Sequence, residues 1–391
     1  MSEMIDKSRI KAVAWAEIDL DAFKRNLESI RKVLNNGEKI CGIVKADAYG
    51  HGSVEIAKTL EENDVEYLAV SRAEEAMELR RKGLDLPILI LGYTPEQRYR
   101  DIIRNDVMFT VYSMEDAVKL NKAAEDLEMD AKVHIKIDTG MNRLGFKVTE
   151  ESVQQIKEIS EMDRISIKGI FTHFAAADEV NKSFTEMQGE KFKYMLNRLK
   201  EEGIEVPLVH AANSAAIVDC DDLKFDMVRA GIIMYGCYPS DDIMKERVPV
   251  EPVMTIKTRV SHIKTIEPGE KISYGCTYEA KEKERIATLA IGYADGFVRG
   301  RKNPKVCING KDYEVVGRIC MDQCMIKIGM DDDIKVGDEA VVFGKGGASI
   351  SEFADDCGTI AHEIMCNISR RIPRVFIEHE DIIKYDDYLR Y

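Results

Sequence analysis

Residues 39 to 232 alternate short apolar runs, which are typical of buried β-strands, with longer amphipathic runs, which are typical of α-helices. The strand-like runs cover residues 39–44, 67–70, 87–91, 108–111, 132–137, 165–171, 208–211 and 227–230. The amphipathic runs between them include residues 54–62, 73–82, 115–127, 151–159 and 190–202. Eight strand–helix units are the number that closes a (β/α)8 barrel. An open doubly wound sheet alternates in the same way, but no G-x-G-x-x-G motif opens the first unit, so we predict a closed TIM-type barrel.

A different pattern follows Tyr238, where the segments become rich in β-forming residues. These segments cover residues 253–266, 285–291, 312–316, 325–328 and 339–343, and turn signals such as Pro268-Gly269 and Asn309-Gly310 separate some of them. We therefore expect a barrel domain over residues 12–242 and a mostly β C-terminal domain over residues 243–391. The strand-like run 12–20 precedes the first expected helix at 21–34, so it is available to join the sheet of the second domain.

The composition is that of an ordinary globular protein. The 391 residues, 45% of them hydrophobic, are enough for a large core and more than one domain. No apolar run approaches the length of a membrane span. The net charge of −14, with both signs mixed along the chain, gives no basic face for nucleic acid. We expect a cytoplasmic protein with neither a membrane nor a nucleic-acid partner, and no secretory signal is visible.

The nine cysteines give no sign of a disulfide framework or a metal site. Their number is odd and no C-x-x-C spacing occurs, which favours a reducing compartment. Cys357, His362 and Cys366 contain ligand types, but their segment has the pattern of an apolar helix, in which core cysteines are the more common state. We expect no metal.

Chemically active side chains follow the predicted barrel strands at one end of each strand. They are Lys45 after the first strand, Arg143 after the fifth, His173 at the end of the sixth, Asn213 and Ser214 after the seventh, and Arg229 at the end of the eighth. In such barrels the carboxyl ends of the strands form the active-site face. A lysine there is a candidate for carbonyl chemistry, and Ser214 and Gly231 match the usual barrel position of a phosphate. A lysine beside a phosphate site indicates pyridoxal phosphate.

Each of these residues also has an ordinary explanation. Lys45 is also consistent with a surface lysine that begins a loop, and His173 with a satisfied core histidine. Arg143 and Arg229 would more often be partners in ion pairs, and Asn213 with Ser214 also suits the start of a helix. The cluster, rather than any single member, favours a site.

The motifs of this chain resemble those of the bacterial alanine racemases, pyridoxal-phosphate enzymes of fold type III. The resemblance covers nearly the whole chain and is carried by AWAEIDLDAFKRNL (14–27), VKADAYGHG (44–52), IKIDTGMNRLGF (135–146), HAANSAA (210–216), MVRAGI (227–232), ISYG (272–275), IGYADGF (291–297) and VGRICMDQ (316–323). It implies an isomerase that interconverts L-alanine and D-alanine, and so supplies D-alanine for peptidoglycan.

The resemblance also implies which residues bind the cofactor. Lys45 would be attached to it, and the other contacts would come from Tyr49, His173, Asn213, Ser214, Arg229, Gly231 and Ile232. Arg229 would face the pyridine nitrogen. Because a guanidinium is effectively never deprotonated, it would leave that nitrogen neutral and the ring a weaker electron sink, which suppresses side reactions such as transamination. His173 would form a hydrogen bond with Arg229.

Racemisation needs one proton-transfer group on each face of the substrate Cα. The resemblance gives one face to Lys45 and the other to Tyr274, which the second domain of a partner subunit would supply, so a homodimer with shared active sites is implied. A free phenol titrates near ~10, so Tyr274 would need a cationic setting to act at neutral pH. Arg143 and His173 are the candidates for that setting.

Further residues match positions that receive the substrate in the family. Arg143 and the main chain at Met321 would bind the substrate carboxylate, and Asp322 would help to hold that loop. Lys136 matches a lysine that is often carbamylated, which would supply a negative group to align Arg143. The substrate corridor would be lined by Asp178, Tyr293, Arg299, Arg318 and Ile368.

Arg370 departs from the family pattern, because many relatives have a tyrosine there that contacts both phosphate and the substrate pocket. A guanidinium also suits a phosphate, but it could change the size or polarity of the pocket. A broader racemase acting on serine or basic amino acids is therefore one alternative. Two others are a fold-III decarboxylase, in which an acidic residue ordinarily takes the place of Arg229, and a pyridoxal-phosphate homeostasis protein, which would lack the second domain.

Overall fold

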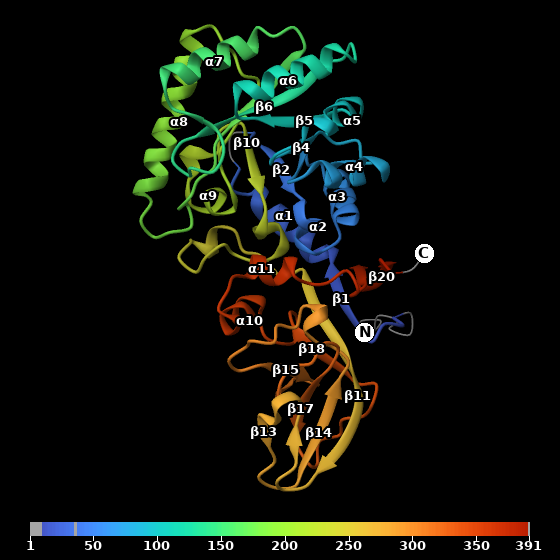
Figure 1. The fold of residues 1–391 in the computed structure, drawn as a ribbon. Coiled ribbons are helices and arrows are strands. Elements are labelled where there is room, and N and C mark those ends of the chain that lie inside the picture. Colours follow the sequence, from blue (N-terminus) through green and yellow to red (C-terminus); the bar gives the residue numbers. More distant parts are fainter. Residues whose placement is uncertain (1–9, 35–36, 390–391) are drawn as a thin grey trace. The chain divides into compact units, whose positions relative to one another are not determined.

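The computed structural model describes residues 10–34 and 37–389, and the chain forms two compact units (Figure 1). The barrel unit comprises residues 26–234 and 238–249. The β unit comprises the described residues 10–25, 235–237 and 250–389. The first strand and the C-terminal part of the sequence therefore belong to one body.

The barrel unit is built on a closed ring of parallel strands. In chain order they are β2 (Lys39–Ile43), β3 (Tyr67–Val70), β4 (Ile88–Ile90), β5 (Val107–Val111), β6 (Ala131–Asp138), β8 (Ile165–Phe171), β9 (Val209–His210) and β10 (Met227–Ala230), and the short β7 (Phe146–Lys147) lies beside β6. The ring closes because β10 pairs with β2 and β5 pairs with β6. The predicted eight-stranded TIM-type barrel is confirmed.

Helices lie around the outside of these strands (Figure 1). They are α3 (Ser53–Glu62), α4 (Ala73–Arg81), α5 (Tyr99–Arg104), α6 (Met114–Glu125), α7 (Glu150–Ser160), α8 (Ser183–Glu201) and α9 (Ser214–Asp219), and α1 (Leu20–Arg31) and α2 (Lys45–Tyr49) precede them in the chain. Ser113, Thr149 and Asn213 cap α6, α7 and α9 by accepting a hydrogen bond from a backbone amide of the first turn. The helix predicted to begin at residue 190 begins at Ser183, because its first turns bury polar and small residues rather than an apolar stripe.

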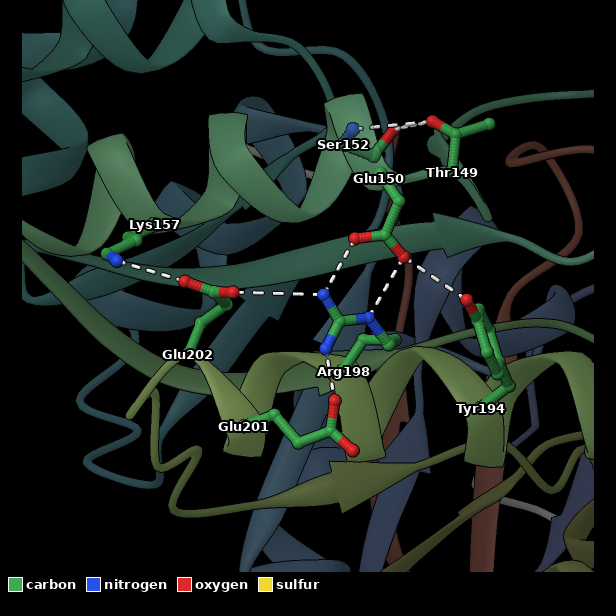
Figure 2. A network of polar contacts seen from close by, with 8 residues as sticks. All are labelled: Thr149, Glu150, Ser152, Lys157, Tyr194, Arg198, Glu201 and Glu202. Atoms are coloured by element: carbon green, nitrogen blue, oxygen red, sulfur yellow. Dashed lines mark hydrogen bonds and ion pairs between the residues drawn. The ribbon is translucent and has the colours of Figure 1, made fainter.

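Helices α7 and α8 are joined by a network of charged side chains on their exposed faces (Figure 2). Arg198 donates two hydrogen bonds to Glu150, at 2.9 and 2.7 Å, and also pairs with Glu201 and Glu202. Lys157 reaches Glu202 at 3.0 Å. Exposed ion pairs stabilise a fold only slightly, so this network contributes little to the stability of the barrel.

The β unit is organised by a mixed sheet. Its strands lie in the order β16 (Lys311–Glu314), β15 (Lys305–Ile308), β18 (Glu339–Phe343), β11 (Met254–Ile266), β1 (Ala14–Asp19), β19 (Arg374–Glu378) and β20 (Asp381–Asp386), and β14 (Glu284–Leu289) and β17 (Cys324–Ile328) extend the sheet from β11. Strand β1 is antiparallel to β11 and parallel to β19. The expected mostly β C-terminal region is confirmed.

Smaller elements complete the β unit. A two-stranded ladder joins β12 (Lys271–Ile272) to β13 (Tyr278–Glu279), and two helices, α10 (Ile350–Cys357) and α11 (Ala361–Cys366), precede β19. Within the described parts of both units, the 3-10 turns are η2 (Glu96–Arg98), η3 (Asp221–Leu223), η4 (Ile232–Tyr235), η5 (Lys245–Arg247), η6 (Tyr274–Cys276) and η7 (Tyr293–Asp295). Trp15 is fully buried in the sheet core and lies under the guanidinium of Arg259, 4.8 Å from its ring centre.

The expectation of core cysteines near the C-terminus is wrong. Cys357 is only partly buried and Cys366 is exposed, because α10 and α11 are two separate short helices rather than one apolar helix. Across residues 10–34 and 37–389, no helix combines the length and apolar character that crossing a membrane requires.

Candidate active site

Lys45 stands directly after β2, at the start of a turn with an unusual backbone. The four residues that follow, Ala46 to Tyr49, have φ values of 52°, 56°, 52° and 53°. Left-handed backbone costs an L-residue about 1–2 kcal/mol, and such residues ordinarily occur singly. A run of them is strained and indicates a functional constraint at this place.

Carboxylates hold this strained turn. Glu75 accepts a hydrogen bond from the amide of Ala46 at 2.6 Å, and its second oxygen accepts from the amide of Ser71 at 2.7 Å. Asp47 accepts from the amide of Ser53 at 2.8 Å. The loops after β2 and β3 are thereby tied together. All of these contacts lie within the barrel unit, so the turn that begins at Lys45 is held by residues of that unit.

Tyr49, Ser214 and Gly231 form a small polar cradle in the barrel unit. The amide of Gly231 donates to the hydroxyl of Ser214 at 3.1 Å. A Cβ on Gly231 would lie 3.0 Å from the hydroxyl oxygen of Tyr49 and 3.4 Å from that of Ser214. Two hydroxyls thus converge on a point that only glycine leaves open. Because hydroxyls can donate to phosphate oxygens, these residues fit a phosphate group.

Arg229 carries a buried charge, and its hydrogen-bond partners among the described residues are neutral acceptors. The residue is 3% exposed, and its guanidinium donates to Nδ1 of His210 at 2.9 Å and to Nδ1 of His173 at 3.0 Å. It also donates to the carbonyls of Thr172 and Ala211, at 2.9 and 2.8 Å. Burial lowers the pKa of Arg229 to about 10, which leaves it protonated at neutral pH. The expected hydrogen bond with His173 is present.

Arg229 also determines the state of the histidines. A guanidinium has no acceptor atom, so His173 and His210 accept through Nδ1 and carry their proton on Nε2. The Nε2 of His210 then donates to Nδ1 of His134 at 2.9 Å. Burial and the charge of Arg229 lower the pKa of His173 and His210 well below the ordinary value, and that of His134 to about 3. All three are neutral, so the expectation that His173 provides a cationic setting for a phenol is wrong.

His134 and His210 were not among the predicted site residues. The sequence did contain an indication of their role, because three of the seven histidines lie in or just after barrel strands. Strand residues that are both polar and buried need partners, which makes such a group informative. Gly169 provides the room, since a Cβ there would lie 2.5 Å from Nδ1 of His134.

Lys136 is a buried amine on β6. Its Nζ donates to the carbonyl of Ile137 at 2.6 Å. Burial, followed by the charge of Arg229, lowers the pKa of Lys136 to about 7, and Arg143 acts in the same direction. A large fraction of this amine is therefore unprotonated, and hence nucleophilic, at neutral pH. Arg143 itself is exposed, in the loop between β6 and β7.

The β unit holds a second group of the expected residues. Tyr274 is 70% exposed and Met321 is 53% exposed, and both line a hollow of about 530 Å³. The other lining residues are Ser273, Cys320, Asp322 and Gln323. Asp322 pairs with Arg371 at 2.9 Å, and Arg371 pairs with Asp295 at 3.2 Å. The ion pair of Asp322 with Arg371 thus joins the loop that carries Met321 to the segment after α11.

The remaining expected residues are divided between the two units. In the barrel unit, Ile232 is buried, Asn213 caps α9, and the carbonyl of Asp178 accepts from Ser240 at 2.7 Å. In the β unit, Ile368 is buried and the guanidinium of Arg370 lies 5.2 Å from the ring centre of Tyr388. Tyr293, Arg299 and Arg318 of the same unit are exposed. The phosphate cradle and the Arg229 cluster are thus within one unit, and Tyr274 and Met321 are within the other.

The whole chain is similar to known proteins. Residues 18–239 match the alanine racemase N-terminal domain model, and residues 253–376 match the alanine racemase C-terminal domain model. An alanine racemase from Methanococcus maripaludis is 49% identical over 366 residues, which are 93% of this chain and 98% of that protein. A solved alanine racemase from Clostridium difficile 630 has a TM-score of 0.96 and 52% identity, covering 97% of this chain and 100% of its own. Another, from Bacillus anthracis with bound L-Ala-P, has a TM-score of 0.92 and 37% identity, covering 97% and 99%.

Proposed function

Because the chain belongs to the alanine racemase family, we propose that it interconverts L-alanine and D-alanine with pyridoxal 5'-phosphate as its cofactor. The observation that carries the proposal is the cradle at Gly231, where the hydroxyls of Tyr49 and Ser214 converge in the unit that also presents Lys45. When bound, the cofactor withdraws electrons from the substrate Cα and so makes its hydrogen acidic.

The cofactor would be held by residues of the barrel unit. Lys45 holds it through the ε-amine, and the phosphate is bound by Tyr49 and the segment that includes Asn213, Ser214, Gly231 and Ile232. Arg229 would face the pyridine nitrogen of the bound cofactor, and His173, which accepts a hydrogen bond from Arg229, would help to hold it there. The four neutral acceptors around Arg229 support this role, because they leave its full positive charge unpaired by any anion. A nitrogen that faces such a cation stays unprotonated.

Two side chains would transfer the protons. Lys45 serves one face of the substrate Cα and Tyr274 serves the other. We assign Tyr274 to the active site of a second copy, so the working unit is a homodimer with shared sites. The high exposure of Tyr274 and Met321 supports this assignment, because both residues line a hollow that a partner surface would cover. Arg143 supplies positive charge for the phenol, since His173 is neutral.

The substrate carboxylate would be received by Arg143 and by the main chain at Met321. Lys136 would align Arg143 after its unprotonated amine adds to carbon dioxide and releases one proton, which converts the neutral amine into a carbamate anion. The low pKa of Lys136 supports this reaction. Asp178, Tyr293, Arg299, Arg318 and Ile368 line the substrate corridor, where charged groups select small zwitterions.

We place the enzyme in the cytoplasm, where it supplies D-alanine for peptidoglycan. Arg370 bears on specificity, because it stands where relatives have a tyrosine. A guanidinium there can bind the cofactor phosphate and leave room for a methyl side chain. Alanine is therefore the preferred substrate, and a higher kcat/KM with serine or a basic amino acid would refute this preference.

The test is a panel of amino acids assayed in D2O with the purified protein loaded with pyridoxal 5'-phosphate. L-Alanine is expected to become an equal mixture of enantiomers, with deuterium at Cα of the D product, as measured by chiral chromatography and mass spectrometry. Release of carbon dioxide would instead indicate a decarboxylase. Cofactor binding without turnover of any amino acid would indicate a homeostasis protein.

A further inference from the structure

The turn that carries Tyr274 has a strained residue directly before the tyrosine. Ser273 has φ 66° and ψ −177°, a combination found almost only in glycine. The two residues after Tyr274 also have positive φ, 74° at Gly275 and 51° at Cys276. A serine in this conformation persists only where its surroundings hold it. The contacts of the Ser273 side chain therefore account for this conformation.

The hydroxyl of Ser273 is bound to the neighbouring loop. It donates to the carbonyl of Arg318 at 2.6 Å and lies 3.4 Å from Sγ of Cys320. Both partners belong to residues 317–323, the loop that also carries Met321. One hydroxyl therefore joins the Tyr274 turn to the Met321 loop within the β unit.

The two loops also touch through glycines on either side of this hydrogen bond. A Cβ on Gly275 would lie 3.0 Å from Nη1 of Arg318, and a Cβ on Gly317 would lie 3.0 Å from the Cβ of Ser273. Contacts this close leave no room for an intervening side chain. The Ser273 hydroxyl thus lies at a direct loop-to-loop junction, at the edge of the hollow that Tyr274 and Met321 line.

Burial does not fix the tyrosine in this unit, since Tyr274 is 70% exposed. Its backbone direction is set instead by the strained residue before it. We propose that Ser273 is a positioning residue for racemisation, whose hydroxyl keeps the phenol of Tyr274 at a fixed spacing from the main chain of Met321. The inference rests on the proposed function, in which these groups transfer a proton and bind the substrate carboxylate.

Three variants of Ser273 distinguish the contribution of the hydroxyl from that of the backbone strain. Ser273→Ala removes the hydroxyl but keeps the Cβ and hence the strained conformation. Ser273→Gly removes the hydroxyl and relieves the strain. Ser273→Cys keeps the Cβ and a weak donor. The matched control is Ser261→Ala, because the exposed Ser261 of β11 donates to the carbonyl of Thr288 at 3.0 Å and neither residue lines the hollow.

Steady-state kinetics of the loaded enzyme give the first readout. Misplacing a reacting group by about 1 Å can cost on the order of 10²-fold, so kcat is expected to fall at least about tenfold in Ser273→Ala and Ser273→Gly, and less in Ser273→Cys. KM for alanine is expected to change little. The isotope effect with α-deuterated alanine is expected to rise for one enantiomer only, because Tyr274 serves one face.

Two kinetic outcomes would overturn the proposal. One is wild-type kcat in Ser273→Gly, which would assign any loss in Ser273→Ala to strain alone. The other is an equal isotope effect for both enantiomers combined with a lower Tm in each Ser273 variant, which would make the residue merely structural. Ser261→Ala is expected to match the wild type in every measurement.

A second readout does not depend on activity. The protein with 3-fluorotyrosine at position 274 is expected to give one narrow 19F resonance, which broadens or divides in Ser273→Ala and Ser273→Gly but not in Ser261→Ala. An unchanged resonance in both Ser273 variants overturns the proposal. If the wild-type protein does not racemise alanine, the proposed function fails, while the 19F spectra still decide whether Ser273 positions Tyr274.

Discussion

The turns that carry Lys45 and Tyr274 both use left-handed backbone, but they are held in different ways. The first places four successive non-glycine residues at positive φ. The carboxylate of Glu75 binds its first amide, and the carboxylate of Asp47, within the turn, binds the amide of Ser53 at the start of α3. The second has Gly275 among its positive-φ residues and is joined to the next loop by the Ser273 hydroxyl. The first ends in the buried Tyr49, whereas Tyr274 is exposed.

This difference shows how the turn that carries each proton-transfer residue is held in its conformation. Hydrogen bonds to a charged group contribute about 1.5–3 kcal/mol, which is enough to offset the strain of a left-handed residue. The Lys45 turn is therefore complete within its own unit. The Tyr274 turn has fewer internal supports, which is consistent with a site that a second subunit completes in our proposal.

The largest effects are expected from replacing the functional residue of each turn, because only one of the two replacements should abolish cofactor binding. Lys45→Ala removes the amine that holds the cofactor, so both the visible absorbance of the bound cofactor and activity in both directions are expected to disappear. Tyr274→Phe removes one proton-transfer group, which ordinarily contributes on the order of 10²–10⁴-fold, and leaves the absorbance intact. Absorbance spectra and rates from each enantiomer measure this. Loss of cofactor in Tyr274→Phe would contradict the assignment.

Mixing these two inactive variants tests whether the turns come from different subunits. A heterodimer formed by exchange contains one site with both native residues, so up to about a quarter to a half of wild-type activity is expected to return, depending on how subunits pair. Exchange is verified with differently tagged chains. If tagged heterodimers form but no activity returns, the composite site is wrong.

Much of the fold could be predicted because strand periodicity is local. The eight barrel strands were recognised within a few residues of their observed ends, and Lys45 was placed at a strand end. The left-handed turn after it could not be predicted, since alanine favours ordinary right-handed helix. Its hand is set by Glu75, which lies far along the chain on α4. The neutral state of His173 likewise depends on Arg229, a residue of another strand.

A smaller effect is expected from filling the phosphate cradle. Gly231→Ala would place a Cβ 3.0 Å from the hydroxyl oxygen of Tyr49, so the affinity for pyridoxal 5'-phosphate is expected to fall about 10- to 100-fold as one or two charge-assisted hydrogen bonds are lost. Titration of the apoprotein followed by absorbance measures it. Gly300→Ala is the control, because a Cβ there meets nothing within 4 Å. Equal affinities in the two variants would exclude the cradle as the phosphate site.

The buried Lys136 predicts a pH dependence of stability. Its pKa of about 7 in the folded protein lies below the ordinary value of 10.5, so between these pH values the unfolded chain binds more protons. The free energy of unfolding is therefore expected to rise with pH above 7, by at most about 1.4 kcal/mol per unit from this group. Urea unfolding at pH 7, 8 and 9, in bicarbonate-free buffer, measures it. Lys136→Met should lack this contribution, and parallel slopes in both proteins would contradict the shifted pKa.

The smallest effect is expected from relieving the backbone strain in the Lys45 turn. Ala46 is exposed and has φ 52° and ψ 48°, which glycine adopts without a Cβ clash. Ala46→Gly keeps the amide that Glu75 binds, and the relief of strain exceeds the added entropy of the unfolded chain, so a gain of about 0.5–1 kcal/mol is expected. The same substitution at Ala123, inside the right-handed helix α6, is expected to cost about 0.5–1 kcal/mol. Urea unfolding compares the two, and a loss of stability at both positions would mean that the Lys45 turn is not strained. A gain at Ala46 with a lower kcat would show that this strain holds the lysine in place, as the Ser273 hydroxyl is proposed to hold the tyrosine.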